Sequence, residues 1–190
     1  MWTVLALLAG LAGQGMADER KGYEMPAYTV ESTEGAREVR AYGPRMVAEV
    51  AVQGDRKAAI NTGFGILAGY IFGGNKEGAK IAMTVPVDQA DQGEGVWTVR
   101  FTMPSAFTAD TLPKPDDSRI LLHPLPSARM VAETFSGLPD SADMAARAAA
   151  LRAWAEARGL TVTGGPVYSF YDAPWSLPWN RRNEVAFTLE

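Results

Sequence analysis

Few side chains in this sequence could perform acid–base or metal chemistry. The chain has a single histidine, His123, and no cysteine, which excludes a two-histidine zinc site, a thiolate metal site and a thiol nucleophile. A Ser/His/Asp triad would have to use His123, which lies between Leu122 and Pro124. General acid–base catalysis would therefore depend on carboxylates and tyrosines.

Two further patterns could carry chemistry, and each has a plainer interpretation. Glu49 and Glu133 end two copies of a repeated segment and could face each other as paired carboxylates, although strand carboxylates are more often exposed. Residues 63–68 match the letters of the dinucleotide fingerprint G-x-G-x-x-A. That match falls inside a predicted helix, whose amides are already hydrogen-bonded and cannot hold a pyrophosphate. We expect no dinucleotide site.

The repeated segments indicate how such residues would be positioned. Residues 45–49, Arg-Met-Val-Ala-Glu, return unchanged as residues 129–133, and residues 99–103 resemble residues 185–189. The agreement of two blocks in order and spacing predicts a duplicated unit. We therefore expect two similar halves in one domain, with Met46 superposing on Met130 and Phe101 on Phe187.

Each half is predicted to contribute one helix and several strands. Helical spacing of apolar residues covers 57–72, which Asp55 can cap, and 142–158. The apolar stripe of the first helix consists of Ile60, Phe64, Leu67 and Ile71. Strands are predicted where β-branched and aromatic residues cluster between Gly and Pro. They cover 28–34, 38–41, 46–52, 80–87, 96–103, 119–122, 130–135, 167–171 and 185–189.

Glycines line another face of the first predicted helix, at Gly65, Gly69 and Gly73. Each glycine inside a helix costs about 1 kcal/mol relative to alanine, so we expect something to approach that face closely. Two interpretations remain open. Either another backbone segment packs against the helix, or a flat ligand lies on it.

The overall composition, with 47% hydrophobic and 21% charged residues in 190, is typical of one globular domain. The net charge of −4 provides no basic excess for phosphate backbones, so we expect no nucleic-acid partner.

The amino-terminal end is predicted to be an export signal. Residues 2–16 are apolar, and Gly15-Met16-Ala17 is typical of a signal-peptidase site. We expect residues 1–17 to be cleaved, and the mature protein to be periplasmic in a Gram-negative bacterium and otherwise secreted. A retained anchor is the alternative, although about 15 residues would reach only about 22 Å across a hydrocarbon core of roughly 30 Å. We expect no stable membrane insertion after cleavage.

Six short motifs occur in order along the mature chain. They are Gly73-Gly74-Asn75, Met83-Thr84-Val85-Pro86-Val87, Phe101-Thr102-Met103-Pro104, Phe135-Ser136-Gly137, Tyr171-Asp172-Ala173-Pro174-Trp175 and Arg181-Arg182-Asn183-Glu184-Val185. Together they resemble the SOUL haem-binding protein family. The resemblance covers residues 18–190 as a single domain, with halves at about 28–104 and 118–190. It implies an α+β fold, a twisted antiparallel β-barrel-like sheet with two flanking helices and two pseudo-symmetric halves.

The same resemblance implies that the protein binds haem or another tetrapyrrole non-covalently, near the first helix and the strand after it. A porphyrin needs a broad apolar slot with cations for its carboxylates. The candidate slot comprises Phe64, Leu67, Ala68, Ile71 and Met83. The candidate cations are Lys76, Lys80, Arg181 and Arg182. The alternatives are ordinary core packing for the apolar set and ion pairs with Glu184 or Asp172 for the two arginines.

Imidazole is a common ligand of haem iron, which makes His123 a possible axial ligand. His123 nevertheless lies in the second half, whereas the candidate slot lies in the first. Pro124 and Pro126 also restrict its neighbours to extended geometry. We therefore expect haem binding not to require His123, and we assign no protein metal ligand.

The sequence thus predicts an exported, non-catalytic protein that binds haem or a related flat apolar ligand as a carrier or buffer. Two alternatives stay open. One is an enzyme acting on a small apolar or tetrapyrrole ligand in the same cleft. The other is a non-catalytic module that binds a protein partner, whose identity the sequence does not indicate.

Overall fold

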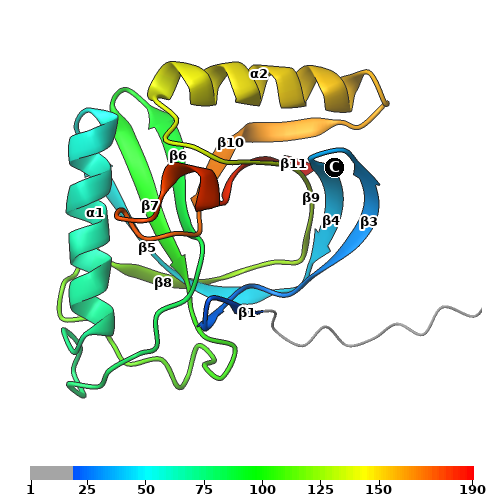
Figure 1. Ribbon diagram of the computed structural model, residues 1–190. Coiled ribbons are helices and arrows are strands. Elements are labelled where there is room, and N and C mark those ends of the chain that lie inside the picture. Colours follow the sequence, from blue (N-terminus) through cyan, green and yellow to red (C-terminus); the bar gives the residue numbers. More distant parts are fainter. Residues whose placement is uncertain (1–18) are drawn as a thin grey trace, which may run out of the picture.

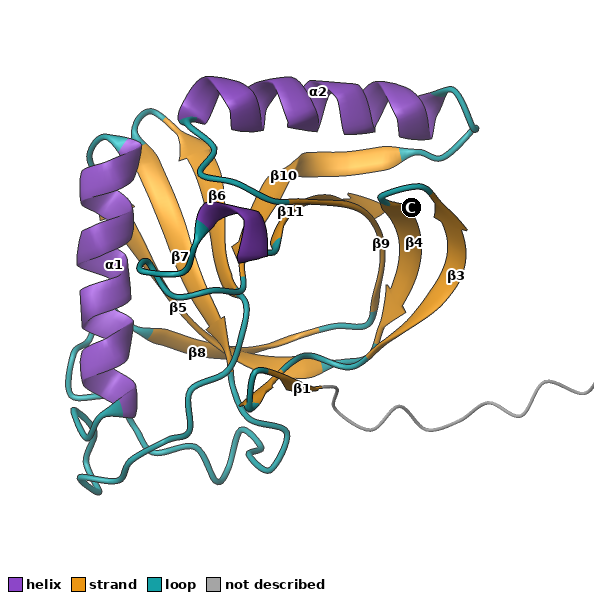
Figure 2. Cartoon of the chain, in the orientation of Figure 1, coloured by secondary structure: helices purple, strands orange, loops and turns teal. Residues whose placement is uncertain are grey.

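The computed structural model describes residues 19–190, and the predicted signal peptide at 1–17 lies outside them. The described chain forms one antiparallel sheet of nine strands, which curls into a half-barrel (Figures 1 and 2). Helices α1 (Arg56–Ile71) and α2 (Ser141–Glu156) lie on the outside of the curl, against different parts of it. The expected fold class, a curled antiparallel α+β sheet with two flanking helices, is therefore confirmed.

Two short strands precede the sheet and pair with each other: β1 (Glu19–Arg20) and β2 (Tyr23–Glu24). The strands of the sheet follow in chain order: β3 (Tyr28–Glu34), β4 (Arg37–Tyr42), β5 (Arg45–Gln53), β6 (Val87–Gly93), β7 (Val96–Thr102), β8 (Leu121–Leu125), β9 (Ala128–Phe135), β10 (Val162–Phe170) and β11 (Asn183–Leu189). A 3₁₀ turn, η1 (Pro178–Asn180), precedes the last strand.

The strand order of the sheet is the same in the two predicted halves. It runs β3-β4-β9-β11-β10-β6-β7-β5-β8, so that β5-β7-β6 of the first half meets β9-β11-β10 of the second half at the β6–β10 pair. Helix α1 links β5 to β6, and α2 links β9 to β10. The strand before each unit crosses to the other half, since β4 pairs with β9 and β8 pairs with β5. The two halves therefore have the same strand order, and each unit pairs with the strand that precedes the other unit.

The repeated pentapeptides lie on equivalent strands but present opposite faces. Met46 and Ala48 pack in the core under α1, whereas Met130 and Ala132 belong to a cluster on the concave side, away from α2. Because side chains alternate along a strand, a shift of one residue moves the whole set to the other face. Our expectation that Met46 superposes on Met130 is therefore wrong, although Phe101 and Phe187 both face a helix.

Helix α1 packs on the sheet through a close approach at Gly63. A Cβ atom at Gly63 would lie 2.5 Å from Cγ2 of Val99. The buried face of the helix includes Ala59, Gly63 and Tyr70, so it is rotated from the predicted stripe, and Phe64 is left 38% exposed at its margin. Asp55 caps the helix as expected, accepting a hydrogen bond from the amide of Ala58.

The other glycine face of α1 is open. A Cβ atom at Gly65 or Gly69 would meet nothing within 4 Å, so the interpretation of a packed backbone segment is wrong at these two positions. They line a shallow depression whose far side is formed by residues around Asp116–Ile120. No helix in the described part of the chain is long and apolar enough to cross a membrane.

Residues 80–86 do not form the predicted strand. Pro86 has no backbone N–H to donate, and Thr84 bonds through its hydroxyl to the carbonyl of Thr102. The strand begins only at Val87, as β6, whose polar sequence concealed it. Its polar residues have partners within the fold, since Asp88 accepts a hydrogen bond from Ser169 and Gln89 accepts one from Arg56.

Candidate functional site

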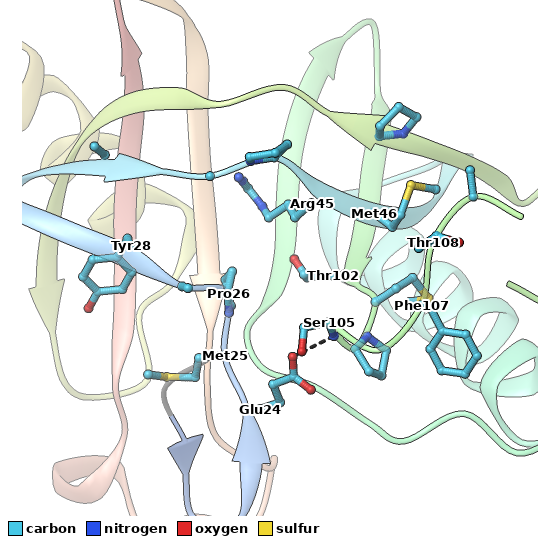
Figure 3. Close-up of a pocket in the computed structure, with 18 of the residues that line it drawn as sticks. Glu24, Met25, Pro26, Tyr28, Arg45, Met46, Thr102, Ser105, Phe107 and Thr108 are labelled. Carbon is cyan, nitrogen blue, oxygen red and sulfur yellow. Dashed lines mark hydrogen bonds between the residues drawn. The ribbon is translucent and has the colours of Figure 1, made fainter. Parts of the chain in front are cut away.

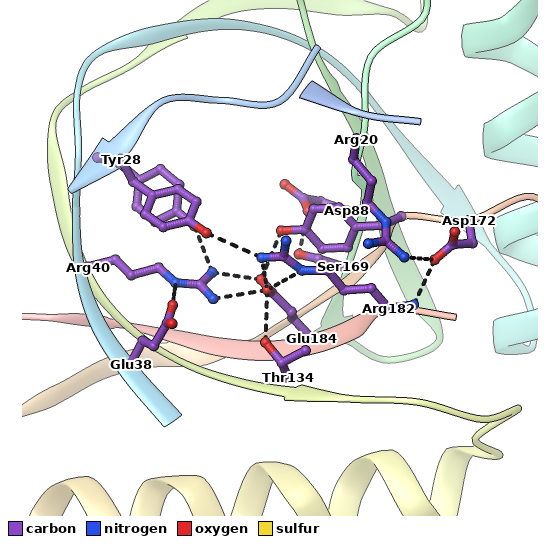
Figure 4. A network of polar contacts seen from close by, with 12 residues as sticks. Arg20, Tyr28, Glu38, Arg40, Asp88, Thr134, Ser169, Asp172, Arg182 and Glu184 are labelled. Carbon is purple, nitrogen blue, oxygen red and sulfur yellow. Dashed lines mark hydrogen bonds and ion pairs between the residues drawn. The ribbon is translucent and has the colours of Figure 1, made fainter. Parts of the chain in front are cut away.

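The concave side of the sheet contains a buried polar network built on Arg40 of β4 and Glu184 of β11 (Figure 4). The two side chains are 1% and 2% exposed and share two hydrogen bonds, of 2.8 and 3.0 Å. Arg182, Tyr171 and Thr134 also donate to the carboxylate of Glu184. Full pairing and hydrogen bonding are what allow charges to be buried at tolerable cost.

The electrostatics of this network favour a structural role. Burial by itself would raise the pKa of Glu184, but the hydrogen bonds and charges of Arg40 and Arg182 lower it to about 2. Burial raises the pKa of Tyr171 well above its usual range. At neutral pH, Glu184 is therefore a permanent anion and Tyr171 a permanent donor. Neither is poised for proton transfer.

Beside the network is a small interior cavity of about 220 Å³. Its lining includes Tyr42, Arg45, Asp88, Arg100, Met130 and Glu184. Burial raises the pKa of Asp88, which Ser169 Oγ partly offsets by donating a 2.6 Å hydrogen bond. The cavity therefore has several ionisable groups on an otherwise mostly apolar lining.

A larger groove opens beside this cavity, with a volume of about 750 Å³. It is lined by residues 24–29, 41, 43–46, 102–105 and 107–109 and by Pro124. These positions include the edge strands β3 and β8, so the groove lies where the curled sheet remains open. Figure 3 shows Met25 and Phe107 on its walls and the hydrogen bond from the amide of Ser105 to Glu24, 2.7 Å long, which joins two of its segments.

Arg45 lines both the groove and the interior cavity. Its Nε and Nη1 atoms are buried and have no hydrogen-bond partner. Burial lowers the pKa of Arg45, although the nearby charge of Asp88 opposes this change. The groove therefore combines apolar walls with one incompletely satisfied cation.

Comparison with known proteins assigns the chain to a family. Residues 23–188 match the family described as SOUL heme-binding protein. The chain belongs to the SOUL family. It is 34% identical over 125 residues to Heme-binding protein 1 of Bos taurus, a match that covers 61% of this chain and 63%, less than two thirds, of the bovine protein. It is 27% identical over 190 residues to Heme-binding protein 2 of Mus musculus, covering 91% and 89% of the two chains.

The solved structures with similar folds are more distant from this SOUL-family chain. The C-terminal domain of EcmrR has a TM-score of 0.61 at 17% identity and covers 86% of this chain and 98% of its own. A structure described as a hydrolase from Listeria innocua has a TM-score of 0.59 at 14% identity, with 84% and 94% covered. At such low identity these similarities establish the curled-sheet fold and nothing about function.

The structure does not bring the predicted apolar slot of this SOUL protein together as one surface. Leu67 and Ile71 are fully buried in the core between α1 and the sheet, as the core-packing interpretation expected for them. Phe64, Ala68 and Met83 are partly or largely accessible. Phe64 packs edge-on against Phe101, with ring centres 5.5 Å apart. Only the accessible residues could meet a ligand on the outer side of the sheet.

The predicted cations are dispersed. Arg182 pairs with Glu184 at 2.6 Å on the concave side of the sheet, so the ion-pair interpretation is confirmed for it. Arg181 donates to the carbonyl oxygens of Ser176 and Pro174. Lys76 pairs with Asp116 at 2.6 Å, and Lys80 is exposed near the end of α1. Of the four, only the two lysines lie on the side of the predicted slot.

His123 lies on the edge strand β8, where its Nε2 atom is 3.2 Å from Glu49. Glu49 also pairs with Arg100, whereas Glu133 pairs with Arg37 and Arg147 on the side of α2. The two glutamates thus have separate partners on opposite faces, and the hypothesis of paired carboxylates is wrong. Within residues 19–190, no three His, Asp or Glu side chains are grouped closely enough to hold a metal ion.

Sequence reasoning missed the two residues that characterise the concave side, Arg40 and Arg45. Arg40 sits in a short polar strand, where nothing in the sequence indicates that its pairing partner is 144 residues away. Arg45 belongs to the repeated pentapeptide, but a basic residue at the start of a strand normally points to solvent. Arg40 reaches Glu184 only because β4 crosses to the second half and pairs with β9, the neighbour of β11.

Proposed function

We propose that this SOUL-family protein binds haem or another tetrapyrrole non-covalently in the groove and acts, after export, as a carrier or buffer. Membership of the family and similarity to two proteins named for binding haem support the choice of ligand. The groove itself supports this location for the ligand, because it is the larger of the two spaces next to Arg45.

The shape and chemistry of the groove suit a flat apolar molecule. Its volume of about 750 Å³ falls within the range of about 300–1,000 Å³ that is typical of small-molecule sites. Methionine and aromatic side chains on its walls adapt to planar rings. They include Met25, Met46, Met103 and Phe107.

The sequence-predicted slot on α1 is the second location to test. Phe64 is 38% exposed and Phe72, two turns further along the helix, is 63% exposed, so the flank of α1 presents apolar surface. Lys80 follows shortly after in the chain and could pair with a carboxylate there. This flank offers a surface rather than an enclosed space, which makes it the weaker candidate.

Binding without catalysis fits the chemistry of the described residues. The buried carboxylate of Glu184 is neutralised by two arginines and has its pKa lowered to about 2. His123 lies on an edge strand beside Glu49 and is not among the residues that line the groove. An enzyme that acts on the same ligand remains the alternative, and its test is turnover of haemin under reducing conditions.

A pair of matched variants tests the function and its location together. Ala27 lines the groove and Ala68 lies on the slot flank of α1, and both are half-buried. Ala27→Trp should fill the groove and weaken the binding of haemin to residues 18–190 at least tenfold, about 1.4 kcal/mol, whereas Ala68→Trp should leave the affinity unchanged. The reverse result would place the ligand on α1. Unsaturable absorbance changes in the wild type would reject haem binding.

Export is tested separately from ligand binding. Mass spectrometry of the protein purified from its native host should find an amino terminus at Asp18, as the signal-peptidase pattern predicts. Recovery of the full chain, with Met1, in a soluble cytoplasmic fraction would contradict export without affecting the assignment of the ligand.

A further inference from the structure

Arg45, the first residue of β5, has a fixed position on the inner wall of the groove. Its backbone pairs with Leu125 of β8, and its guanidinium carbon lies 5.0 Å from the centre of the Tyr42 ring. In Figure 3 the side chain lies between Tyr28 and Met46, two residues of the groove wall. The cation is therefore held where the groove meets the interior cavity.

The guanidinium of Arg45 lacks the partners that the other inward-facing arginines have. Of the arginines in the described chain, Arg45 alone has two buried nitrogen atoms without a hydrogen bond. By contrast, the guanidinium groups of Arg40 and Arg182 bind Glu184, and that of Arg100 binds Glu49. A buried cation is costly unless it is paired and hydrogen-bonded, so the missing partner requires an explanation.

Asp88 does not supply that partner. Its carboxylate influences Arg45 through its charge, but its hydrogen bond is with Ser169. Burial raises the pKa of Asp88 and so disfavours its charged form. The ring of Tyr42 compensates the cation only in part. The anion that would complete the site must therefore come from outside the chain.

We propose that Arg45 anchors a carboxylate of the tetrapyrrole that binds in the groove, and that the site thereby selects ligands with a free acidic group. This inference rests on the proposed function, because it assigns one contact of that ligand. The Nε and Nη1 atoms have no partner within the fold, so the guanidinium can donate charge-assisted hydrogen bonds to a carboxylate by turning toward the groove, while the apolar walls accept the ring. The site therefore binds an apolar molecule that is acidic at one edge.

The experiment compares haemin with its dimethyl ester, in which both carboxylates are blocked, in the wild type and in Arg45→Met. Methionine keeps an unbranched apolar side chain but removes the charge. The wild type should bind haemin at least tenfold more tightly than the ester. Arg45→Met should bind haemin as weakly as the ester and bind the ester unchanged. Without ligand, Arg45→Met should resist urea at least as well as the wild type, because the fold loses no hydrogen bond of this guanidinium.

Arg119→Met is the matched control, because Arg119 is exposed and pairs only with its neighbour Asp117. It should change neither affinity. Equal binding of the two porphyrins by the wild type, or an unchanged haemin affinity in Arg45→Met, would overturn the anchor and leave haem binding intact. Failure of the wild type to bind either porphyrin would overturn the proposed function and the anchor together.

Discussion

Substituting Gly63 and Gly69 with alanine should change the stability of the protein in opposite directions. Both glycines lie inside α1, so each substitution gains about 1 kcal/mol of helix propensity. At Gly63 the new methyl group would lie 2.5 Å from Cγ2 and 2.9 Å from Cβ of Val99, which is fully buried. Overpacking of this kind costs about 1–3 kcal/mol or more. At Gly69 the methyl group would meet nothing within 4 Å.

We therefore expect Gly69→Ala to stabilise the protein by up to about 1 kcal/mol, and Gly63→Ala to destabilise it by about 1–2 kcal/mol. Equilibrium urea unfolding of residues 18–190 measures both, through the midpoint at constant m-value. Both substitutions gain the same helix propensity, so the difference between their stabilities measures the contact between α1 and the sheet. Equal stabilisation by the two substitutions would refute the close approach of α1 to β7. If a stably folded Gly69→Ala variant lost haemin binding, that result would place the binding site on the open glycine face of α1.

Three other predictions concern the polar network and the histidine. Glu184 has a pKa of about 2 in the fold against 4.5 as its ordinary value. This lowered pKa adds about 3 kcal/mol to the free energy of unfolding above pH 4.5, and the contribution is lost as the pH falls toward 2. Urea unfolding of Glu184→Gln should therefore show a lower stability than the wild type at pH 7 and a weaker dependence of stability on acid pH. Arg40→Met should lower the free energy of unfolding by about 3–5 kcal/mol, because it leaves the carboxylate of Glu184 poorly paired. The control Arg129→Met breaks the exposed pair with Glu31 and should lower it by less than about 1 kcal/mol. Similar melting points for the two variants would contradict the stabilising role of the network. His123→Ala should keep the haemin affinity and the Soret band, and loss of the band in a folded variant would make His123 the axial ligand.

The parts of the fold that follow from local chemistry could be predicted from the sequence. Asp55 and the helical spacing after it located α1, because a cap and a periodic apolar pattern depend only on neighbouring residues. The alternation around Val99 and Phe101 located β7 and its core face in the same way. The order of the repeated blocks predicted the matching strand order of the two halves.

The rest depends on contacts between distant residues. Gly63 is buried because α1 approaches Val99 closely, and a glycine gives no apolar signal of burial. The polar strand β6 is stable because Asp88 and Gln89 find partners on β10 and α1. The matching pentapeptides proved to be out of register by one residue, which letters alone cannot reveal because either face of a strand can be buried.

The candidate site was the least predictable part. The family motif that contains Arg182 and Glu184 was recognised from the sequence, but its role in bracing the concave side depends on Arg40 from the other half. The groove is assembled from six separate stretches of chain, so no single motif marks it. Arg45 became a candidate only when the structure placed two of its nitrogen atoms inside without partners.

The central claim, that this protein binds a tetrapyrrole in its groove, is tested most directly by titrating residues 18–190 with haemin and following the Soret band. We predict a saturable change at one haemin per chain with a Kd in the micromolar range, about 8 kcal/mol, and a marked loss of that change in Ala27→Trp. A change that never saturates, or one that is identical in the wild type and in Ala27→Trp, would contradict the assignment of the groove as the binding site.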